Sequence, residues 1–311
     1  MALLAEADHE AAVDLFKQTL ELVPQWAAGW FSLAEAFEKS GQTAQAIDAF
    51  KTCLMLSPSD PLGAGIRLER LGWFDGFGSV EGVGSAEGVD SWHHKNPAMT
   101  PAYVSALFDQ YAERFDDHLT RVLEYRGPDI ITSALEAACA SHHRRFHFAA
   151  ALDLGCGTGL MAKAIAQNIG FIDGVDLSPA MVSLARKTNV YRTAFAGDMM
   201  SALQDNQQAY DLIVAADVFV YMGELALLFS AAKLALTKDG LFAFTIQSCD
   251  GDSFKLGDDL RYHHSETYIG KIAALAGLTV TSLEPCITRH DAGKPALGFV
   301  VVLSHADSAH D

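Results

Sequence analysis

The hydrophobic and polar positions of the chain follow two different patterns, one in each part. Up to about residue 74, apolar residues recur three or four positions apart, which predicts amphipathic helices. From about residue 148 onward, short apolar runs alternate with helical stretches. Alternation of this kind is typical of a mostly parallel sheet with helices on its faces. We therefore expect a small all-α domain followed by an α/β domain.

The clearest predicted strand is the apolar run Phe148–Leu154. It leads into Gly155, Gly157 and Gly159, and a helical pattern begins at once at Leu160. Strand, tight glycine turn and helix form the opening of a nucleotide-binding α/β unit. Alternate glycines permit a sharp turn and let a ligand lie against bare backbone, and the first amides of the next helix can donate hydrogen bonds to that ligand.

The spacing of these glycines differs from the dinucleotide fingerprint G-x-G-x-x-G. Leu160 stands where the last glycine of that fingerprint would fall, and Asp153 stands two residues before the first glycine. A carboxylate at that place repels a pyrophosphate and attracts a cationic ligand. The pattern therefore favours a cationic ligand, with a dehydrogenase or a glycine turn without a ligand as the alternatives.

Residues 152–159 read Leu-Asp-Leu-Gly-Cys-Gly-Thr-Gly and resemble motif I of the class I S-adenosylmethionine-dependent methyltransferases. The resemblance implies an α/β, Rossmann-like, seven-stranded sheet that is mostly parallel and has an antiparallel last strand. It also implies an S-adenosylmethionine-dependent methyltransferase (EC 2.1.1.-) whose product is S-adenosylhomocysteine. The cofactor contacts it implies in this stretch are Asp153, Gly155, Cys156, Gly157 and Gly159, with Cys156 contacting the cofactor through its backbone.

The second predicted strand, residues 171–176, ends in Asp176. A carboxylate at this strand end can accept hydrogen bonds from both ribose hydroxyls. Leu177 next to it can press on the adenine. Ser178 and the proline after it predict the start of a helix, as an N-cap followed by proline at the first helical position. The spacing matches the second cofactor-binding motif of these methyltransferases, with a solvent-facing acid as the alternative.

The third predicted strand, residues 191–196, is followed by Asp198 and Met199, and the fourth, residues 210–215, by Asp217. By resemblance, Asp198 accepts a hydrogen bond from the adenine amino group, and Met199 offers its backbone amide to a ring nitrogen. The resemblance places Asp217 on the floor of the site near the methyl donor.

The last part of the chain predicts a fifth strand at 241–247, a helix at 265–276 and two final strands at 279–285 and 297–303. The polar, irregular stretch 249–264 between the fifth strand and the helix is expected to form a substrate loop, because loops at the carboxyl ends of strands carry specificity.

Two aromatic residues and one histidine complete the candidate site. Tyr111 and Tyr125 lie in a helical segment that resembles the lid preceding motif I, and an aromatic face there would attract a sulfonium. Ordinary core packing is the alternative for both. His264 is the candidate catalytic base, because residues 261–268 resemble a stretch found in related methyltransferases. A structural pairing of His264 with Ser265 is the alternative.

The N-terminal helices carry a repeat of about 34 residues that resembles the tetratricopeptide (TPR) pattern. Small residues at fixed positions let paired helices approach, aromatic residues fill the gaps, and proline ends the second helix. The residues of the pattern are Trp30, Leu33, Ala34, Phe37, Ala46, Phe50 and Pro58, with Ala12, Phe16 and Pro24 one repeat earlier. The whole chain resembles the bacterial predicted methyltransferases that bear N-terminal TPR repeats. The repeats are expected to contact a partner or a second copy of the chain, or to serve as a structural appendage.

These patterns predict four segments. They are a TPR-like domain at 1–74, a glycine-rich linker at 75–97, a methyltransferase domain at 98–303 with its helical lid at about 98–138, and a polar tail at 304–311. The linker is rich in glycine, serine and acids, which is typical of a flexible connection.

Charge and composition argue against some classes of partner and site. The formal net charge of -17 argues against nucleic acid and against an anionic membrane surface, since both recruit clustered Lys and Arg. The five cysteines are scattered and form no C-x-x-C pair, which indicates a reduced, cytoplasmic protein. The N-terminus does not resemble a signal peptide, and no apolar run is long enough to span a membrane. The twelve histidines lack metal-ligand spacing, so we expect no metal site.

Two functional hypotheses follow. The first is a methyltransferase that acts on an unidentified acceptor, a small molecule or a protein, at oxygen, nitrogen or carbon. The second is an interaction scaffold that binds the cofactor without turnover. Both require S-adenosylmethionine binding at the same strand ends.

Overall fold

The structure is a computed structural model that describes residues 9–73, 99–117, 123–291 and 293–306. The contacts divide the chain into two compact units. The first holds the residues up to 106 together with the short segment 256–260, and the second holds 107–255 and the residues from 261 onward. The predicted linker at 75–97 lies outside the described residues, and the predicted domain limits stay predictions.

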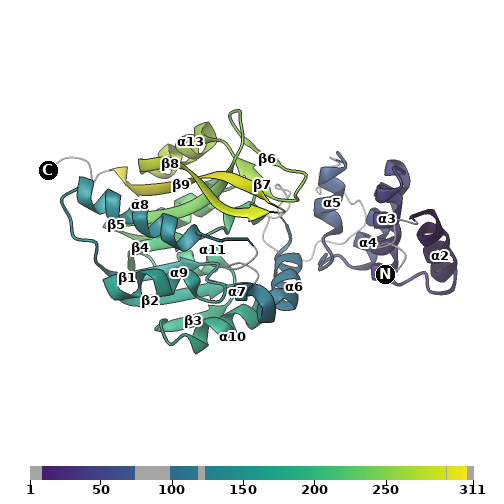
Figure 1. The fold of residues 1–311 in the computed structure, drawn as a ribbon, viewed down its shortest axis with the longest axis horizontal. Helices are drawn as coiled ribbons and strands as arrows, with labels where there is room; N and C mark the ends of the chain where they lie inside the picture. The colour runs from purple at the N-terminus through teal and green to yellow at the C-terminus, as the bar shows by residue number, and fades with distance from the viewer. Residues whose placement is uncertain (1–8, 74–98, 118–122, 292, 307–311) are drawn as a thin grey trace. The chain divides into compact units, whose positions relative to one another are not determined.

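The first unit is built from short helices, shown in purple to blue in Figure 1. They are α2 (His9–Leu22), α3 (Ala27–Lys39), α4 (Thr43–Leu56) and α5 (Ala64–Arg70). Their core is made of the small and aromatic residues of the sequence pattern, namely Ala12, Phe16, Leu33, Ala34, Phe37, Ala46 and Phe50. An all-α region is therefore present as predicted, whereas its assignment as TPR repeats stays a prediction.

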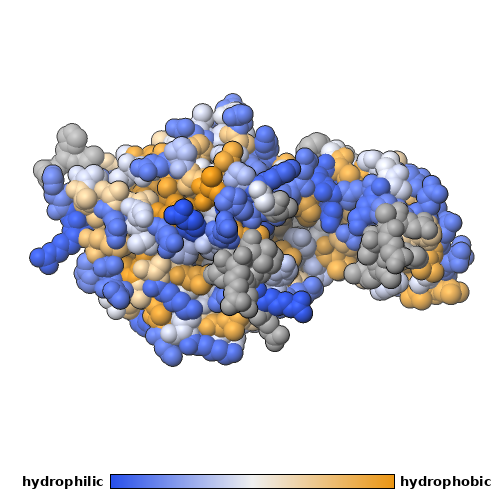
Figure 2. Space-filling view, viewed as in Figure 1, coloured by the Kyte–Doolittle hydropathy of each residue, from blue (hydrophilic) through white to orange (hydrophobic). Residues whose placement is uncertain are grey.

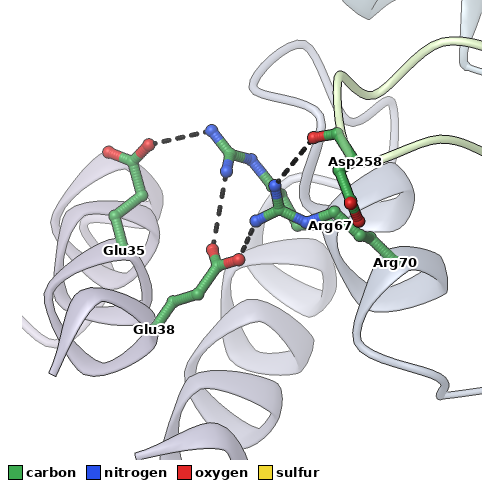
Figure 3. A network of polar contacts seen from close by, with 5 residues as sticks. All are labelled: Glu35, Glu38, Arg67, Arg70 and Asp258. Atoms are coloured by element: carbon green, nitrogen blue, oxygen red, sulfur yellow. Dashed lines mark hydrogen bonds and ion pairs between the residues drawn. The ribbon is translucent and has the colours of Figure 1, made fainter. Parts of the chain in front are cut away.

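A network of charges joins helices α3 and α5 (Figure 3). Arg67 pairs with Glu35 at 3.1 Å and with Glu38 at 3.5 Å, and Arg70 also pairs with Glu38. A guanidinium nitrogen of Arg70 further donates to the backbone carbonyl of Asp258, at 3.5 Å. This contact connects the helices to segment 256–260, which belongs to the same unit. Because these side chains are partly exposed, each pair contributes at most about 1 kcal/mol.

The second unit contains one sheet, drawn mostly in teal to yellow in Figure 1. Nine strands of this sheet lie among the described residues. Strands β3, β2, β1, β4 and β5 are parallel and lie in that order; β9 pairs antiparallel with β5, and β8 with β9. The strands are β1 (Phe148–Leu154), β2 (Ile169–Asp176), β3 (Thr193–Ala196), β4 (Tyr210–Ala215), β5 (Leu236–Ser248), β6 (Phe254–Leu256), β7 (Tyr262–His264), β8 (Leu278–Asp291) and β9 (Lys294–His305).

The prediction of seven strands is wrong in its count. The two additional strands, β6 and β7, arise within residues 249–264, which were expected to be irregular. Strand β7 pairs with Gln247 and Ser248 at the end of β5. Since Gln247 also pairs with Gly298 of β9 on its other edge, β7 occupies the edge of β5 next to β4, beyond the end of β4. The mostly parallel sheet with antiparallel C-terminal strands is confirmed.

The helices of this unit cover both faces of the sheet. They are the C-terminal half of α6 (Pro101–Tyr111), then α7 (Phe115–Asp117), α8 (Gly127–Ser141), α9 (Leu160–Ile165), α10 (Pro179–Lys187), α11 (Met199–Gln204), α12 (Ala226–Ala235) and α13 (Glu266–Ala276). Three single turns, η1 (Ala112–Arg114), η3 (Ala166–Asn168) and η4 (Phe219–Tyr221), connect them. Figure 2 shows hydrophilic and hydrophobic residues interspersed on the visible face.

The core of the sheet lies in two layers. Helices α8 and α9 pack on the face that carries Leu241 and Ala243 of β5. Because side chains alternate along a strand, Phe242 and Phe244 point to the other face, where they meet Phe229 of α12 with ring centroids 5.6 and 5.4 Å apart. The central strands are therefore buried on both faces, and their carboxyl ends form the exposed edge on which a site can be built.

Candidate active site

The turn after β1 has the backbone that its glycines predict. Gly155, Gly157 and Gly159 have φ of 62°, 51° and 91°, in the left-handed region that favours glycine. A Cβ on Gly155 would lie 2.6 Å from a methyl of Val218, so packing alone requires glycine there. A Cβ on Gly157 would meet nothing closer than Phe115 at 3.8 Å. The turn thus leaves bare backbone at Gly157, where a Cβ would make only an ordinary van der Waals contact with Phe115.

Asp176 at the end of β2 is fixed across this turn. Its Oδ2 accepts from the Gly157 amide at 2.9 Å, and its Oδ1 accepts from the Ser178 amide at 2.8 Å. Burial raises the pKa of the Asp176 carboxyl, the two amides oppose that shift, and nearby Asp109 adds to it. Ser178 caps helix α10 through its hydroxyl, as predicted. Each carboxylate oxygen retains a second lone pair for a ligand.

Asp153 lies in the same edge and is 1% exposed. Its Oδ2 accepts from the Tyr191 hydroxyl at 2.7 Å. Burial raises the pKa of Asp153 to about 7, Tyr191 opposes that shift and the charge of Asp176 adds to it. Neither Asp153 nor Asp176 forms an ion pair with a residue that the structure describes. This pair of acids without a cation suits a cationic ligand.

The adenine-side candidates lie at the neighbouring strand end. Strands β2 and β3 are in register with Asp176 opposite Ala196, so Asp198 follows on the same edge of the sheet. Asp198 caps α11, and its Oδ2 accepts from the Ser201 amide at 3.1 Å. The amide of Met199 is the first of that helix and has no acceptor within it. Leu177 is half-buried beside Asp176. Their contacts with adenine stay predictions.

The backbone groups of Cys156 form hydrogen bonds within the protein. Its amide donates to the Val175 carbonyl at 3.0 Å, and its carbonyl accepts from the Gly159 amide at 2.9 Å. The thiol is 4% exposed and packs against Val182 and other apolar residues. Burial raises the pKa of the Cys156 thiol, so it stays protonated. The predicted backbone contact of Cys156 with the cofactor could use only its carbonyl.

Asp217 follows β4 and has a left-handed backbone, with φ of 61°. Its amide donates to the Thr245 hydroxyl at 2.9 Å, and Nη1 of Arg289 donates to its Oδ2. Arg289 comes from β8 and is 1% exposed. The sequence interpretation missed Arg289, because it ended this strand at residue 285 and placed 289 in a turn. The signal that was available is a lone arginine in a stretch of otherwise β-forming residues.

The two candidate tyrosines occupy different environments. Tyr125 lies just before α8, in a segment bound to β8 on either side of Arg289 through the hydrogen bonds Arg126 N to Thr288 O and His290 N to Leu123 O, both 2.8 Å. Burial, followed by the charge of Asp217, raises the pKa of Tyr125 well above its ordinary value, so the phenol stays protonated. Tyr111 is 44% exposed at the end of α6, and its contact with the cofactor stays a prediction.

Two further acids bind the helical segment before β1 to the site, one at the glycine turn and one at the start of α10. Asp116 accepts from the Thr158 hydroxyl at 2.5 Å, and Asp109 accepts from the Ser178 hydroxyl at 2.5 Å. The described part of the predicted lid therefore touches the site, while residues 118–122 lie outside the described chain. The sequence interpretation did not find the contacts of Asp116 and Asp109.

His264, the candidate base, is completely buried. Its Nε2 donates to the Gly223 carbonyl at 2.9 Å, and its ring stacks on Tyr268 with centroids 5.7 Å apart. Burial lowers the pKa of His264 to about 4, so the ring is neutral at physiological pH. Ser265 next to it caps α13. These contacts favour the structural alternative, in which His264 anchors the segment after β4, and a catalytic role stays a prediction.

Among the described residues, no group of three or more His, Cys, Asp or Glu is arranged to hold a metal ion. No helix in the described part of the chain is long and apolar enough to cross a membrane.

Comparison with known proteins identifies the domain that carries these strand ends. Residues 151–240 match the family model described as a methyltransferase domain. The chain carries a methyltransferase domain. Over 74 residues it is 31% identical to the dTDP-3-amino-3,6-dideoxy-alpha-D-glucopyranose N,N-dimethyltransferase of Streptomyces fradiae, covering 24% of this chain and 29% of that protein. The chain thus spans less than a third of the curated relative that it matches.

The methyltransferase domain also resembles solved structures. One is the Burkholderia thailandensis 1,6-didemethyltoxoflavin-N1-methyltransferase with bound 1,6-didemethyltoxoflavin and S-adenosylhomocysteine. Its TM-score is 0.51 at 16% identity, covering 65% of this chain and 87% of that one. Another is an S-adenosylmethionine-dependent methyltransferase from Clostridium acetobutylicum, with a TM-score of 0.47 at 18% identity, covering 64% and 99%. The predicted Rossmann-like fold is confirmed by the first, and the match of residues 151–240 confirms a methyltransferase domain.

Proposed function

We propose that the protein transfers a methyl group from S-adenosylmethionine to an acceptor, a small molecule or a protein, at the carboxyl ends of β1, β2 and β4. One observation carries this proposal. Asp153 and Asp176 are two acids without a cationic partner among the described residues, placed around a glycine turn where a Cβ on Gly157 would make no contact closer than 3.8 Å. S-adenosylmethionine offers two cationic groups, two ribose hydroxyls and a flat adenine, which match these features.

The residues that would hold the donor follow the order of the strand ends. Asp176 has lone pairs left for the ribose hydroxyls, because the amides of Gly157 and Ser178 take one on each oxygen. Asp198 and the amide of Met199 lie at the next strand end for the adenine, with Leu177 between them. Asp153 lies in the remaining position, where a positive charge is favoured.

The acceptor would lie near Asp217 and Tyr125, on the side of β4 and β8. Bound S-adenosylmethionine supplies a methyl group that its sulfonium has already activated. The chain then has to align acceptor and donor and exclude water. Tyr125 can donate a hydrogen bond but not accept a proton, because its phenol stays protonated. His264 acts on this side through Gly223, whose carbonyl it holds.

The roles of the helical unit and the location of the protein also remain proposals. We propose that the first unit contacts a protein partner or a second copy of the chain, in keeping with the resemblance to TPR-bearing methyltransferases. The five cysteines are free in the structure, which supports the expected cytoplasmic location.

The proposal is tested by titrating the purified protein with S-adenosylmethionine in a calorimeter and then supplying labelled donor with lysate fractions. We expect saturable binding and transfer of label into one fraction. Binding without transfer to any fraction would favour the alternative, a scaffold that binds the cofactor without turnover. No heat at high micromolar donor would exclude both readings.

The raised pKa of Asp153 predicts a pH-dependent affinity for the donor. A cationic ligand favours the charged carboxylate, so binding should release about half a proton per site at pH 7, where Asp153 is about half protonated. The affinity for S-adenosylmethionine should rise about eightfold between pH 6 and pH 7.5, because the charged fraction of an acid with a pKa near 7 rises by that factor. Calorimetry in two buffers of different ionisation enthalpy measures both quantities.

The controls are one variant and one neutral ligand. Asp153→Asn keeps an oxygen for the Tyr191 hydroxyl but cannot titrate, so its donor affinity should be flat with pH. 5′-Methylthioadenosine carries no charge on its sulfur side and should bind the unmodified protein with little pH dependence. A pH-independent affinity of the unmodified protein for S-adenosylmethionine would refute the role of Asp153.

A further inference from the structure

Arg289 is buried, and two of its three guanidinium nitrogens have no hydrogen-bond partner among the described residues. The residue is 1% exposed, and Nη1 alone donates to Asp217. Its Nε and Nη2 atoms are buried without a hydrogen-bond partner among the described residues. Such atoms are rare in folded proteins, because leaving a charged donor unpaired costs much of its hydration free energy.

The two unused nitrogens lie on the same edge of the guanidinium, because Nη1 is the nitrogen on the side of Cδ. That edge presents two parallel N–H bonds, which is the geometry that binds the two oxygens of a carboxylate. A guanidinium can bridge two carboxylates, one on each edge. Asp217 already occupies one edge through Oδ2, so a second carboxylate fits the other.

The residues around Arg289 place its Nε and Nη2 nitrogens near the carboxyl ends of the strands, where the proposed active site lies. Arg289 pairs with the residue that follows β4, and its electrostatic neighbours reach Tyr125 and, through it, Asp153 beside the glycine turn. The backbone on both sides of Arg289 is fixed by the hydrogen bonds to residues 123 and 126. Arg289 is therefore a rigid cation that pairs with Asp217 and lies close to Tyr125, whose electrostatic neighbours also include Asp153.

We propose that the Nε and Nη2 edge of Arg289 binds a carboxylate of a reactant in the active site. The inference rests on the proposed function, because it takes the site to be occupied by methyl donor and acceptor. Two sources can supply the carboxylate: the methionine part of S-adenosylmethionine, or the methyl acceptor. With the donor bound as proposed, its ribose hydroxyls face Asp176 and its cationic groups face Asp153, and its carboxylate is the group left to pair with a cation.

The test compares ligands that differ only in the carboxylate. Calorimetry measures the affinities of the full chain for S-adenosylmethionine and for decarboxylated S-adenosylmethionine. The variant is the pair Arg289→Met with Asp217→Asn, which removes both buried charges together and leaves neither unpaired. Circular dichroism checks that the variant is folded.

If the donor supplies the carboxylate, the unmodified protein binds S-adenosylmethionine at least tenfold more tightly than the decarboxylated form, and the double variant loses this preference. If the acceptor supplies it, the two donors bind alike, and a carboxylate probe, benzoate, binds the complex with S-adenosylhomocysteine. That binding, followed by broadening of the benzoate NMR signals, is then lost in the double variant. The variant Arg289→Lys should show little of the donor preference or of the benzoate binding, because a lysine lacks the two parallel N–H groups of a guanidinium.

A matched control is the double variant Arg192→Met with Asp173→Asn. It removes another arginine–aspartate pair of the same sheet, between β2 and the start of β3. It should lower stability and leave both ligand preferences unchanged. Equal binding of the two donors together with no benzoate binding would overturn the inference and leave Arg289 a purely structural partner of Asp217. A protein that binds no S-adenosylmethionine at all would instead refute the proposed function.

Discussion

Replacement of Asp176 by asparagine is expected to lower the affinity for S-adenosylmethionine by about 100-fold. The carboxylate is positioned to accept both ribose hydroxyls, and each hydrogen bond to a charged group contributes roughly 1.5 kcal/mol or more, so losing two costs about 3 kcal/mol. An asparagine also turns its amide group toward either Gly157 or Ser178, whose N–H groups need acceptors. Calorimetric titration of the variant measures the loss.

The control for Asp176→Asn is Asp211→Asn on the same sheet. Asp211 accepts from two backbone amides, those of Ala149 and Ala150, each at 2.8 Å, as Asp176 does from Gly157 and Ser178. It lies at the start of β4, at the opposite edge of the sheet from the glycine turn. Asp211→Asn should lower the melting temperature about as much as Asp176→Asn does. It should leave the affinity for the donor unchanged. Equal donor affinities of Asp176→Asn and Asp211→Asn would contradict the proposed site.

The parts of the fold that local pattern determines were predictable. Strands β1 and β4 have the predicted bounds, because a continuous apolar run flanked by turn residues is a sufficient signal for a buried strand. Ser178 caps α10 as expected. Ser265, where the predicted helix begins, is the N-cap of α13, and Gly277 ends α13 in the left-handed conformation. Strands β6 and β7 were not predictable, because they are three residues long and depend on pairing with a distant strand end.

The candidate site divides in the same way. The acids at the strand ends could be found from sequence, since the carboxyl ends of parallel strands meet at one edge whatever the side chains do. Tyr191 and Arg289 could not, because their partners Asp153 and Asp217 lie 38 and 72 residues away in the chain. His264 is the opposite case, in which the sequence suggested a role that its tertiary contacts do not favour. Its sequence context favours chemistry, whereas its burial and its bond to Gly223 depend on tertiary packing.

Replacement of Gly157 by alanine is expected to weaken S-adenosylmethionine binding by roughly thirtyfold, with little rearrangement of the protein. The added methyl group would be in ordinary contact with Phe115 at 3.8 Å, so it fits without a clash in the protein and takes up room on the backbone against which we propose the ligand lies. Filling a close-packed contact in this way costs about 2 kcal/mol. The left-handed φ of 51° adds a stability cost of about 1–2 kcal/mol for any residue with a Cβ.

The variant Gly277→Ala separates the effect of Gly157→Ala on ligand binding from its effect on stability. Gly277 has a φ of 75°, and a Cβ there would also meet its nearest atom, on Lys233, at 3.8 Å. It caps the C-terminus of α13, so its variant pays the same backbone cost without reaching the strand ends. Both variants should melt at similar temperatures, and only Gly157→Ala should lose donor affinity. If Gly157→Ala binds S-adenosylmethionine as the unmodified protein does, the donor does not lie against this turn, and the assignment of the turn as the cofactor site is wrong.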